Sequence, residues 1–235
     1  MSDDILKELK KASSPEKAKL LSRFFKTGKE EYGEGDKFIG VVVPEIRKIA
    51  KKHLHLSLNE IEKHLHSKVH EERLVALLIL VEKFKKSNEK EKKEIFDFYL
   101  KNTKYINNWD LIDLTAPTIV GLYLLNKDKK ILYYMSTSES IWEKRISIMS
   151  TFCFIKCSKF EDSFNISEIL INDKHDLIHK AVGWMLREIG KKNLEAEEKF
   201  LKKEDRYKKM PRTMLRYAIE KFPEEKRKKY LNGEI

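Results

Sequence analysis

Residues 105–117, YINNWDLIDLTAP, place a tryptophan and two aspartates in a run that is otherwise largely apolar. Asp110 has a structural explanation, because a carboxylate in the first turn of a helix interacts favourably with the helix dipole and the free N–H groups. Asp113 lies about one turn further along and gains little from that effect. Trp109 comes four residues before Asp113, and a helix presents residues at this spacing on the same face. An aromatic ring beside a carboxylate is suited to stabilising a positively charged group.

The other two tryptophans lie in segments with a similar mixture of aromatic and charged residues. Trp142 occurs with Arg145 in IWEKR, and Trp184 occurs in HKAVGWMLRE. Two interpretations remain open for this set. Trp142 and Trp184 can be ordinary core residues, with Asp113 and Arg145 forming a buried ion pair that holds neighbouring helices together. Alternatively, Asp113, Arg145 and Trp184 form one site with Trp109. Trp142 fits a core role better and is left out of this site.

The composition indicates which elements hold these residues. Of the 235 residues, 41% are hydrophobic and 37% are charged, which excludes a disordered chain. With only 8 glycines and 5 prolines, the chain has few turn formers for a sheet protein, and its apolar residues recur at helical spacing. Capping signals, such as the Ser57–Glu60 pair, Asn108 and the final Asn232–Gly233, divide the chain into short helices. We therefore expect an all-α protein.

One pattern recurs along the chain, a charged residue followed directly by an apolar run. It is found in RLVALLIL (73–80), DLTAPTIV (113–120), RISIMSTF (145–152), KAVGWMLR (180–187) and RTMLRYAI (212–219). The leading residues are 40, 32, 35 and 32 positions apart, and a recurrence near 35 residues, with a helical hairpin in each unit, is typical of helical solenoids. The sequence therefore predicts a superhelical solenoid of HEAT-like antiparallel helix pairs, with residues 1–235 forming a single domain.

The leading residues of this repeat are basic in four units out of five, and Asp113 is the exception. If these positions line one concave surface, that surface is a basic trough with a single carboxylate in it. The formal net charge of the chain is +11, and residues 191–235 contain 15 Lys and Arg against 9 Asp and Glu. Such a charge suits a polyanion, most simply nucleic acid, although a solvated lysine-rich surface explains the charge as well.

The basic C-terminal segment KKEDRYKKMPRTMLRYAIEKF contains most of the candidates for phosphate contacts. Together with one leading residue of the repeat, the predicted DNA-binding residues are Lys180, Lys208, Lys209, Arg212 and Arg216. Such contacts bind nucleic acid without reading its sequence. The same segment also suits a terminal unit that closes a solenoid with a polar outer face, and the two roles are compatible.

Several segments give the chain a family resemblance. NWDLID, IWEKR and KAVGWMLRE, together with SPEKAKLLSRFF and VPEIRKIAKK, resemble the AlkD-type alkylpurine DNA glycosylases, a family of HEAT-like repeat proteins. The resemblance runs from about Ser14 to Phe222. Its W-x-x-x-D and G-W-x-L-R-E elements are specific when they occur together in this order.

The resemblance implies an enzyme that hydrolyses the N-glycosidic bond of cationic N3- or N7-alkylpurines, such as 3-methyladenine and 7-methylguanine, in double-stranded DNA without a pocket for a flipped base. It implies that Asp113 is catalytic and that Arg145 helps to hold the DNA backbone. It also implies that Trp109 and Trp184 contact the deoxyribose backbone. These residue types suit the reaction, because a cationic purine leaves readily and a carboxylate stabilises the sugar cation that develops.

The N-terminal region departs from the family pattern. A tyrosine on the family's second helix corresponds to Phe24, which has no hydroxyl group. Residues 27–40, TGKEEYGEGDKFIG, form a longer connection than in the family, and they hold four of the eight glycines and four acidic residues. We expect a loop or small hairpin near the DNA-facing edge, in which Tyr32 replaces the missing hydroxyl. Phe24 and Tyr32 are therefore predicted substrate-binding residues.

These departures leave two alternatives to a glycosylase. The first is a non-catalytic HEAT-like DNA-binding relative that is specialised for damaged or branched DNA. The second is a HEAT-like scaffold that binds an acidic protein. The two differ in the salt dependence of DNA binding, because binding through several phosphate contacts weakens steeply as salt rises.

The remaining features predict neither a metal site nor a cofactor. Cys153 and Cys157 lie one helical turn apart in an apolar stretch and are expected to be reduced core residues. His175 and His179 are four residues apart but lack a third ligand. The chain has no apolar run of 18 residues and no secretory signal. We therefore expect a monomer in the cytoplasm, associated with the nucleoid and not with a membrane.

Overall fold

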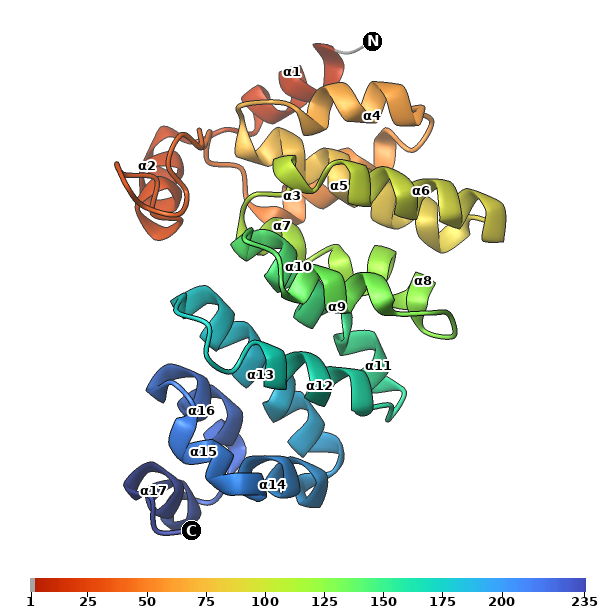
Figure 1. The fold of residues 1–235 in the computed structure, drawn as a ribbon. Coiled ribbons are helices and arrows are strands. Elements are labelled where there is room, and N and C mark those ends of the chain that lie inside the picture. The colour runs from red at the N-terminus through yellow and green to blue at the C-terminus, as the bar shows by residue number, and fades with distance from the viewer. Residues whose placement is uncertain (1–2) are drawn as a thin grey trace. The chain divides into compact units, whose positions relative to one another are not determined.

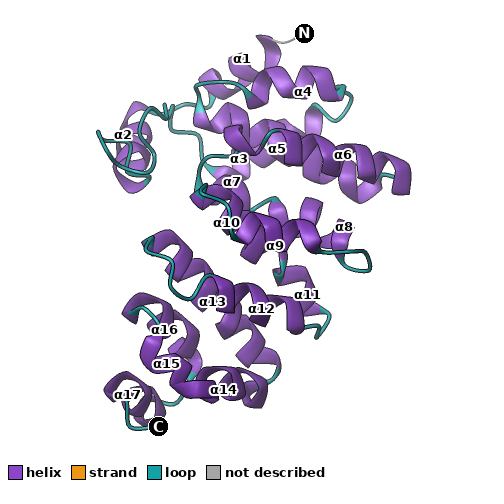
Figure 2. Cartoon of the chain, in the orientation of Figure 1, coloured by secondary structure: helices purple, strands orange, loops and turns teal. Residues whose placement is uncertain are grey.

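The computed structural model describes residues 3–235, and these residues form helices joined by loops, without a β-strand (Figure 2). The all-α prediction is therefore confirmed. The chain divides into two compact units, residues 1–115 and residues 116–235, which we call the N-terminal and C-terminal units. That residues 1–235 act as one HEAT-like repeat domain stays a prediction. None of the described helices is long and apolar enough to span a bilayer.

The N-terminal unit is built around α5 (Figure 1). Its elements are α1 (Asp3–Lys11), α2 (Pro15–Phe24), α3 (Val43–Lys52), α4 (Leu58–Leu65), α5 (His70–Lys86), α6 (Glu89–Lys101), the 3₁₀-helix η1 (Thr103–Tyr105) and α7 (Trp109–Asp113). Residues 74–81 of α5 are all buried, because α1, α3, α4 and α6 pack around them. A helix that is apolar around its whole circumference must be covered on every side.

The C-terminal unit is organised around α13. Its elements are the π-helix η2 (Pro117–Gly121), α8 (Leu122–Leu124), α9 (Lys130–Ser136), α10 (Ile141–Ser150), α11 (Phe152–Lys156), α12 (Glu161–Ile169), α13 (Asp176–Lys192), α14 (Leu194–Lys202), η3 (Lys203–Asp205), α15 (Arg206–Lys209), α16 (Arg212–Ala218), η4 (Ile219–Lys221) and α17 (Glu224–Asn232). α13 packs against α10, α14 and α16. Gly183 permits the close approach to α16, because a Cβ atom there would lie 2.4 Å from the carbonyl oxygen of Met214.

The predicted capping signals form as expected. Ser57 and Glu60 make both hydrogen bonds of a capping box at the start of α4. Asn108 caps α7, since its Oδ1 accepts a hydrogen bond of 2.8 Å from the backbone N–H of Trp109. α17 ends at Gly233, whose φ of +78° is the left-handed conformation that glycine favours.

The helix predicted to continue through residues 113–120 is interrupted. α7 ends at Asp113, Leu114 and Thr115 form a turn, and a π-helix begins at Pro117. The interruption has a local cause, because Pro117 lacks the N–H that would bond to the carbonyl of Asp113 in a continuous α-helix. Asp113 is therefore the last residue of a short helix and does not begin an apolar one.

The two cysteines differ in their surroundings. Both are free, and Cys153 is buried as predicted. Burial raises the pKa of the Cys153 thiol to about 12. The core prediction is wrong for Cys157, which is exposed because it follows the last residue of α11 and lies outside the packed turn.

Candidate functional site

The short helix α7 presents two of the predicted site residues. Leu111 and Ile112 are completely buried, and α7 packs against α5. Trp109 and Asp113, at the two ends of α7, remain partly exposed. The aromatic ring and the carboxylate are therefore one helical turn apart on a helix whose inner face anchors it, as their spacing predicted.

An aromatic cluster supports Trp109. The ring of Phe25 stacks on it with centroids 5.0 Å apart and an angle of 19° between the planes. Phe24 meets Trp109 edge to face at 5.8 Å, although 63% of Phe24 is exposed. Phe38 also stacks on Phe25, with ring centroids 4.9 Å apart. The structure thus brings Phe24 beside Trp109, and Phe25 occupies one face of the tryptophan.

Tyr32 lies close to Phe24, as its predicted role requires. Its hydroxyl is 3.5 Å from the backbone carbonyl oxygen of Phe24, and the ammonium of Lys26 lies 5.9 Å from its ring centroid. The segment that carries Tyr32 is a series of turns and not a hairpin; Lys37 forms only an isolated bridge with Val69. The predicted loop is confirmed and the alternative hairpin is not formed.

A buried polar network beneath the aromatic cluster was not foreseen from the sequence. The imidazole of His70 lies between two carboxylates, with Nδ1 3.1 Å from Asp36 Oδ2 and Nε2 2.8 Å from Asp110 Oδ2. Arg73 donates to Asp36 Oδ1 at 2.6 Å. Asn108, the cap of α7, donates from Nδ2 to Asp36 Oδ2 at 3.1 Å. The only sequence signals were an acidic residue in a glycine-rich segment and a His and an Arg in the first turn of an apolar helix.

The network holds opposite charges in a buried place. Burial opposes a charge on His70, but the charge of Asp110 and the hydrogen bonds to Asp110 and Asp36 outweigh it, so the pKa of His70 is raised. Burial also opposes the charge of Asp36, yet the hydrogen bond to His70 and the charge of Arg73 outweigh it, so the pKa of Asp36 is lowered. This ion cluster connects the loop at residues 27–40 to α5 and to the cap of α7. It therefore positions the helix that carries Trp109 and Asp113.

A second carboxylate fixes the end of the same loop. Glu71, which is 1% exposed, accepts hydrogen bonds from the backbone N–H groups of Ile39 (3.0 Å), Gly40 (2.8 Å) and Val41 (3.3 Å). Gly40 has a φ of +87°, a left-handed conformation that favours glycine. Glu71 of α5 and the glycine at position 40 thus hold this end of the loop in place.

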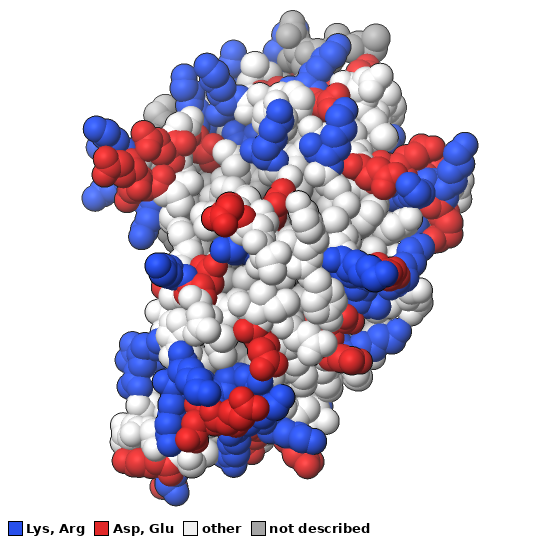
Figure 3. Space-filling view, viewed as in Figure 1, with Lys and Arg blue, Asp and Glu red and all other residues white. Residues whose placement is uncertain are grey.

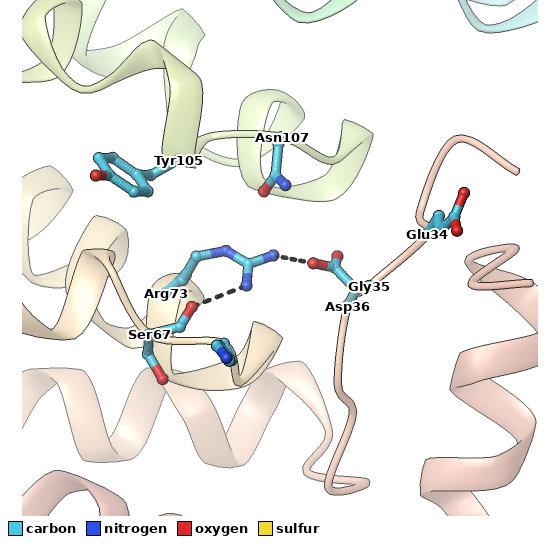
Figure 4. A pocket seen from close by; sticks show the side chains of 8 residues that line it. Glu34, Gly35, Asp36, Ser67, Arg73, Tyr105 and Asn107 are labelled. Atoms are coloured by element: carbon cyan, nitrogen blue, oxygen red, sulfur yellow. Dashed lines mark hydrogen bonds and ion pairs between the residues drawn. The ribbon is translucent and has the colours of Figure 1, made fainter. Parts of the chain in front are cut away.

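A polar pocket of about 210 Å³ opens beside the network (Figure 4). Its lining residues are Glu34, Gly35, Asp36, Ser67, Lys68, Arg73, Tyr105 and Asn107. Arg73 is only 4% exposed, and its Nε has no hydrogen-bond partner, nor does Oδ1 of Asn107. Both atoms are buried, so they are unpaired polar groups in the interior beside the pocket.

The charge of Asp113 also affects the pKa of a buried tyrosine. Tyr99 is completely buried, and its hydroxyl lies 2.9 Å from Thr115 Oγ1. Burial, reinforced by the negative charge of Asp113, raises the pKa of Tyr99. The field of the Asp113 carboxylate thus extends into the interior of the N-terminal unit.

The C-terminal unit contains the other predicted substrate-binding residues. Arg145 is 4% exposed, and its guanidinium donates to the carbonyl oxygen of Leu177 at 2.6 Å. Trp184 is partly exposed, and its Nε1 donates to Glu188 at 3.1 Å. Lys180 forms an ion pair with Asp176 at 2.6 Å. Each of these side chains is therefore oriented by a partner on α13.

The four C-terminal cations lie at the surface. Lys208, Lys209, Arg212 and Arg216 are all exposed. Lys208 lies 3.4 Å from Asp205, and Arg212 donates to the carbonyl oxygen of Leu231 in α17. Figure 3 shows basic and acidic side chains intermixed over this region. The segment thus caps the C-terminal unit, and its exposed cations remain candidates for phosphate contacts.

The repeat predicted exposed cations at its leading positions, and this prediction is wrong for two of them. Arg73 and Arg145, two of its four cations, are each 4% exposed. Arg73 is neutralised by Asp36, whereas Arg145 is engaged with α13. The leading positions of the repeat are therefore partly interior, because an Arg in the first turns of a packed helix can reach partners inside its own unit.

The two histidines considered as metal ligands have structural roles. His175 caps α13, since its Nδ1 accepts from the N–H of Leu177 at 3.1 Å. His179 forms a hydrogen bond with the carbonyl oxygen of Asp173 at 2.5 Å. Across residues 3–235, no group of three or more His, Cys, Asp or Glu side chains is placed to hold a metal ion.

Comparisons with known proteins identify the family. The chain is similar to a solved structure described as a predicted DNA alkylation repair enzyme from Enterococcus faecalis, with 18% sequence identity, a TM-score of 0.70, and coverage of 90% of this chain and 97% of that one. This similarity shows a shared fold. No curated protein sequence matches significantly. The model of the family described as DNA alkylation repair enzyme matches residues 5–222. This protein therefore belongs to the DNA alkylation repair enzymes, a family whose substrate is DNA.

Proposed function

We propose that this protein is a monofunctional DNA glycosylase that removes cationic N3- or N7-alkylpurines, such as 3-methyladenine and 7-methylguanine, from double-stranded DNA. The carrying observation is the placement of Trp109 and Asp113 one turn apart on α7, with both side chains partly exposed. Family membership supports DNA repair as the setting. The choice of glycosidic-bond hydrolysis rests on the chemistry that this pair of side chains favours.

Asp113 is the electrostatic catalyst in this proposal. The C1′–N bond breaks, and its electron pair goes to the alkylated purine, which leaves as a neutral base. Water then adds to C1′ with loss of a proton. A carboxylate about 4 Å from the developing sugar cation contributes about 4 kcal/mol at an effective dielectric constant near 20. An interaction of that size made only in the transition state corresponds to about a thousandfold in rate.

The remaining roles follow the sequence resemblance. Trp109 and Trp184 are assigned to the deoxyribose backbone, and Arg145 to the orientation of that backbone. Lys180 and the exposed cations of α15 and α16 are assigned to phosphates, where they bind without reading sequence. The reaction needs no cofactor in this scheme, and a monomer suffices.

The test is the release of free bases from methylated double-stranded DNA, separated by chromatography. Asp113→Asn keeps the size of the side chain and removes its charge, so release falls by about a thousandfold while DNA affinity changes little. Asp97→Asn is the matched control, because Asp97 is an exposed residue of α6 that forms a surface ion pair with Lys93. Equal loss of binding and release in Asp113→Asn would show that Asp113 is structural.

One observation favours a second function, a DNA-binding relative that has lost catalysis. Phe24 supplies no hydroxyl, and the hydroxyl of Tyr32 is directed to the Phe24 backbone. This alternative predicts tight, salt-sensitive binding of damaged or branched DNA and no base release by the wild type. A HEAT-like scaffold for an acidic protein predicts neither DNA binding nor release.

A further inference from the structure

α7 is held by buried polar contacts at both of its ends. A helix of five residues is too short to be stable by itself, so its position depends on the groups that bind its ends. Asn108 and His70 hold the first turn. The other end, which carries Asp113, is held by two hydroxyl groups, those of Thr115 and Tyr99.

The hydroxyl of Thr115 closes the last turn of α7. The backbone N–H of Thr115 donates to the carbonyl oxygen of Ile112 at 3.0 Å, in a tighter turn than an α-helix makes. The hydroxyl of the same residue donates to the carbonyl oxygen of Leu111 at 2.5 Å. This carbonyl is the one that the N–H of Thr115 would reach in a continuous α-helix. The side chain thus takes over the role of the backbone donor at the point where the chain leaves the helix.

Tyr99 of α6 fixes the direction of that hydroxyl. Its own hydroxyl lies 2.9 Å from Thr115 Oγ1, and both side chains are completely buried. A threonine hydroxyl has one hydrogen, and because Thr115 donates it to Leu111, Tyr99 is the donor of the second bond. Burial and the nearby charge of Asp113 raise the pKa of Tyr99, so this donor stays protonated at neutral pH. Two hydrogen bonds in series therefore run from α6 to residues 111 and 115, which lie on either side of Asp113 in the chain.

The two hydroxyls constrain the geometry more than they add to the packing. Phenylalanine and valine would fill nearly the same space, and replacing both partners of a buried hydrogen bond by apolar groups of the same shape can be nearly neutral for stability. A buried hydrogen bond differs from an apolar contact because it requires one geometry. The branched side chain of Thr115 adds to this constraint, since it has few χ1 rotamers. The bonds from Tyr99 thus restrict the orientation of the end of α7.

We propose that Tyr99 and Thr115 are positioning residues, which hold the carboxylate of Asp113 at the distance from the sugar cation where it is catalytically effective. This inference rests on the proposed function, in which Asp113 is the electrostatic catalyst. Neither hydroxyl touches the substrate, because both are completely buried. The attraction between a carboxylate and a cation weakens with distance, and a misplacement of about 1 Å can cost about a hundredfold in rate. Loss of either hydroxyl therefore weakens catalysis and spares DNA affinity.

The experiment compares binding to two duplexes that a glycosylase cannot cleave. One contains a tetrahydrofuran abasic analogue, which is neutral, and the other contains a pyrrolidine analogue, which is cationic at neutral pH and resembles the sugar cation. The ratio of the two Kd values, measured by fluorescence anisotropy, reports the interaction of Asp113 with the positive charge. We expect wild type to prefer the pyrrolidine duplex by about a hundredfold and Asp113→Asn to lose this preference. Tyr99→Phe and Thr115→Val should each lower the preference by about tenfold, while affinity for the tetrahydrofuran duplex changes by less than about twofold.

Three further variants separate positioning from a general loss of stability. Thr115→Ser keeps the hydroxyl and should retain the preference that Thr115→Val loses. Tyr230→Phe is the matched control, because Tyr230 is also buried and its hydroxyl donates to Glu198 at 3.2 Å. Its melting temperature should fall about as much as that of Tyr99→Phe, with the preference unchanged. The double variant Tyr99→Phe, Thr115→Val should lose about as much preference as either single variant, because both act through one series of hydrogen bonds.

Base release by the same variants completes the test. Tyr99→Phe should lower kcat by about tenfold and leave KM unchanged, since the interaction that it weakens is made in the transition state. The expected preferences without any base release by wild type would overturn the glycosylase proposal alone.

The opposite results would overturn the positioning role. A full preference for the pyrrolidine duplex in Tyr99→Phe and Thr115→Val, with the preference lost in Asp113→Asn, would overturn this inference alone. An equal loss of affinity for both duplexes in Tyr99→Phe would also overturn it, because the hydroxyl would then support the fold and not the carboxylate. Equal binding of the two duplexes by wild type would overturn both proposals, since Asp113 would have no effect on a positive charge.

Discussion

The Nε2 atom of His70 lies 2.8 Å from the carboxylate of Asp110, and this pair joins the start of α5 to the first turn of α7. The other nitrogen of the same ring reaches Asp36 at 3.1 Å. One imidazole thus connects the loop at residues 27–40 to the helix that carries Trp109 and Asp113. The catalytic geometry that we propose depends on a charge cluster that makes no contact with the substrate in our scheme.

The His70 cluster predicts a pH dependence of stability. A histidine whose pKa is raised in the folded state stabilises it fully below the unfolded pKa of about 6.5, and this contribution is lost as pH rises through the folded value. Asp36, Asp110 and Arg73 are the charged groups around the ring. We expect His70→Gln to lower the free energy of unfolding by about 3 kcal/mol at pH 6. Urea unfolding between pH 6 and 9 should show this difference shrinking as pH rises, and a constant difference would contradict a charged His70.

Glu197 predicts a second pH dependence of stability, in the same direction as that of His70. It is 1% exposed, its Oε1 has no hydrogen-bond partner, and burial together with the nearby charge of Glu198 raises its pKa to about 9. The folded protein keeps this proton while the unfolded chain releases it above about pH 4.5, so stability falls with rising pH between these two values.

Glu197→Gln removes that titration and keeps the shape of the protonated carboxyl group. The variant should be more stable than wild type at pH 7, by up to about 3 kcal/mol, and its advantage should vanish near pH 4. Thermal melting at both pH values measures the two differences. A variant that is equally stable or less stable at pH 7 would show that the carboxyl group is ionised in the folded protein.

Gly183→Ala tests the packing of α13 on α16. A Cβ atom at this position would lie 2.4 Å from the Met214 carbonyl and 2.5 Å from the Cβ of Tyr217, so the two helices must separate. We expect a loss of about 1–3 kcal/mol in the free energy of unfolding, measured by denaturant titration. Gly28→Ala is the control, because the atoms near its Cβ belong to the flexible side chain of Glu31. Similar losses in both variants would show that the effect is not one of helix packing.

Phe24→Tyr tests whether the missing hydroxyl limits catalysis. Phe24 is 63% exposed, so the added oxygen should leave stability within about 0.5 kcal/mol of wild type. If the hydroxyl forms one hydrogen bond in the transition state, base release should rise by roughly tenfold. Tyr32→Phe in the same assay should lower release if Tyr32 already supplies the hydroxyl. Unchanged release in both variants would remove the hydroxyl from the mechanism.

The sequence by itself determined the features that depend on near neighbours. Helical spacing of apolar residues predicted an all-α chain, and the caps at Ser57, Asn108 and Gly233 lie at the predicted helix ends. The four-residue spacing of Trp109 and Asp113 fixed them on one face of α7. The break after Asp113 can also be read from the sequence, because Pro117 lacks the N–H that a continuous helix would bond to the carbonyl of Asp113. Helical periodicity and capping act within one or two turns, so they can be read along the chain.

Only the tertiary structure decided which distant groups meet. Asp36 and His70 are 34 residues apart, and Phe24 and Trp109 are 85 apart, and no local pattern pairs them. Arg73 shows the consequence most clearly, because its type and register predicted a surface cation, whereas Asp36 draws it into the interior. A buried charge is stable only beside its partner. Whether a charged residue faces solvent or the core therefore depends on a partner that the fold, and not the neighbouring sequence, provides.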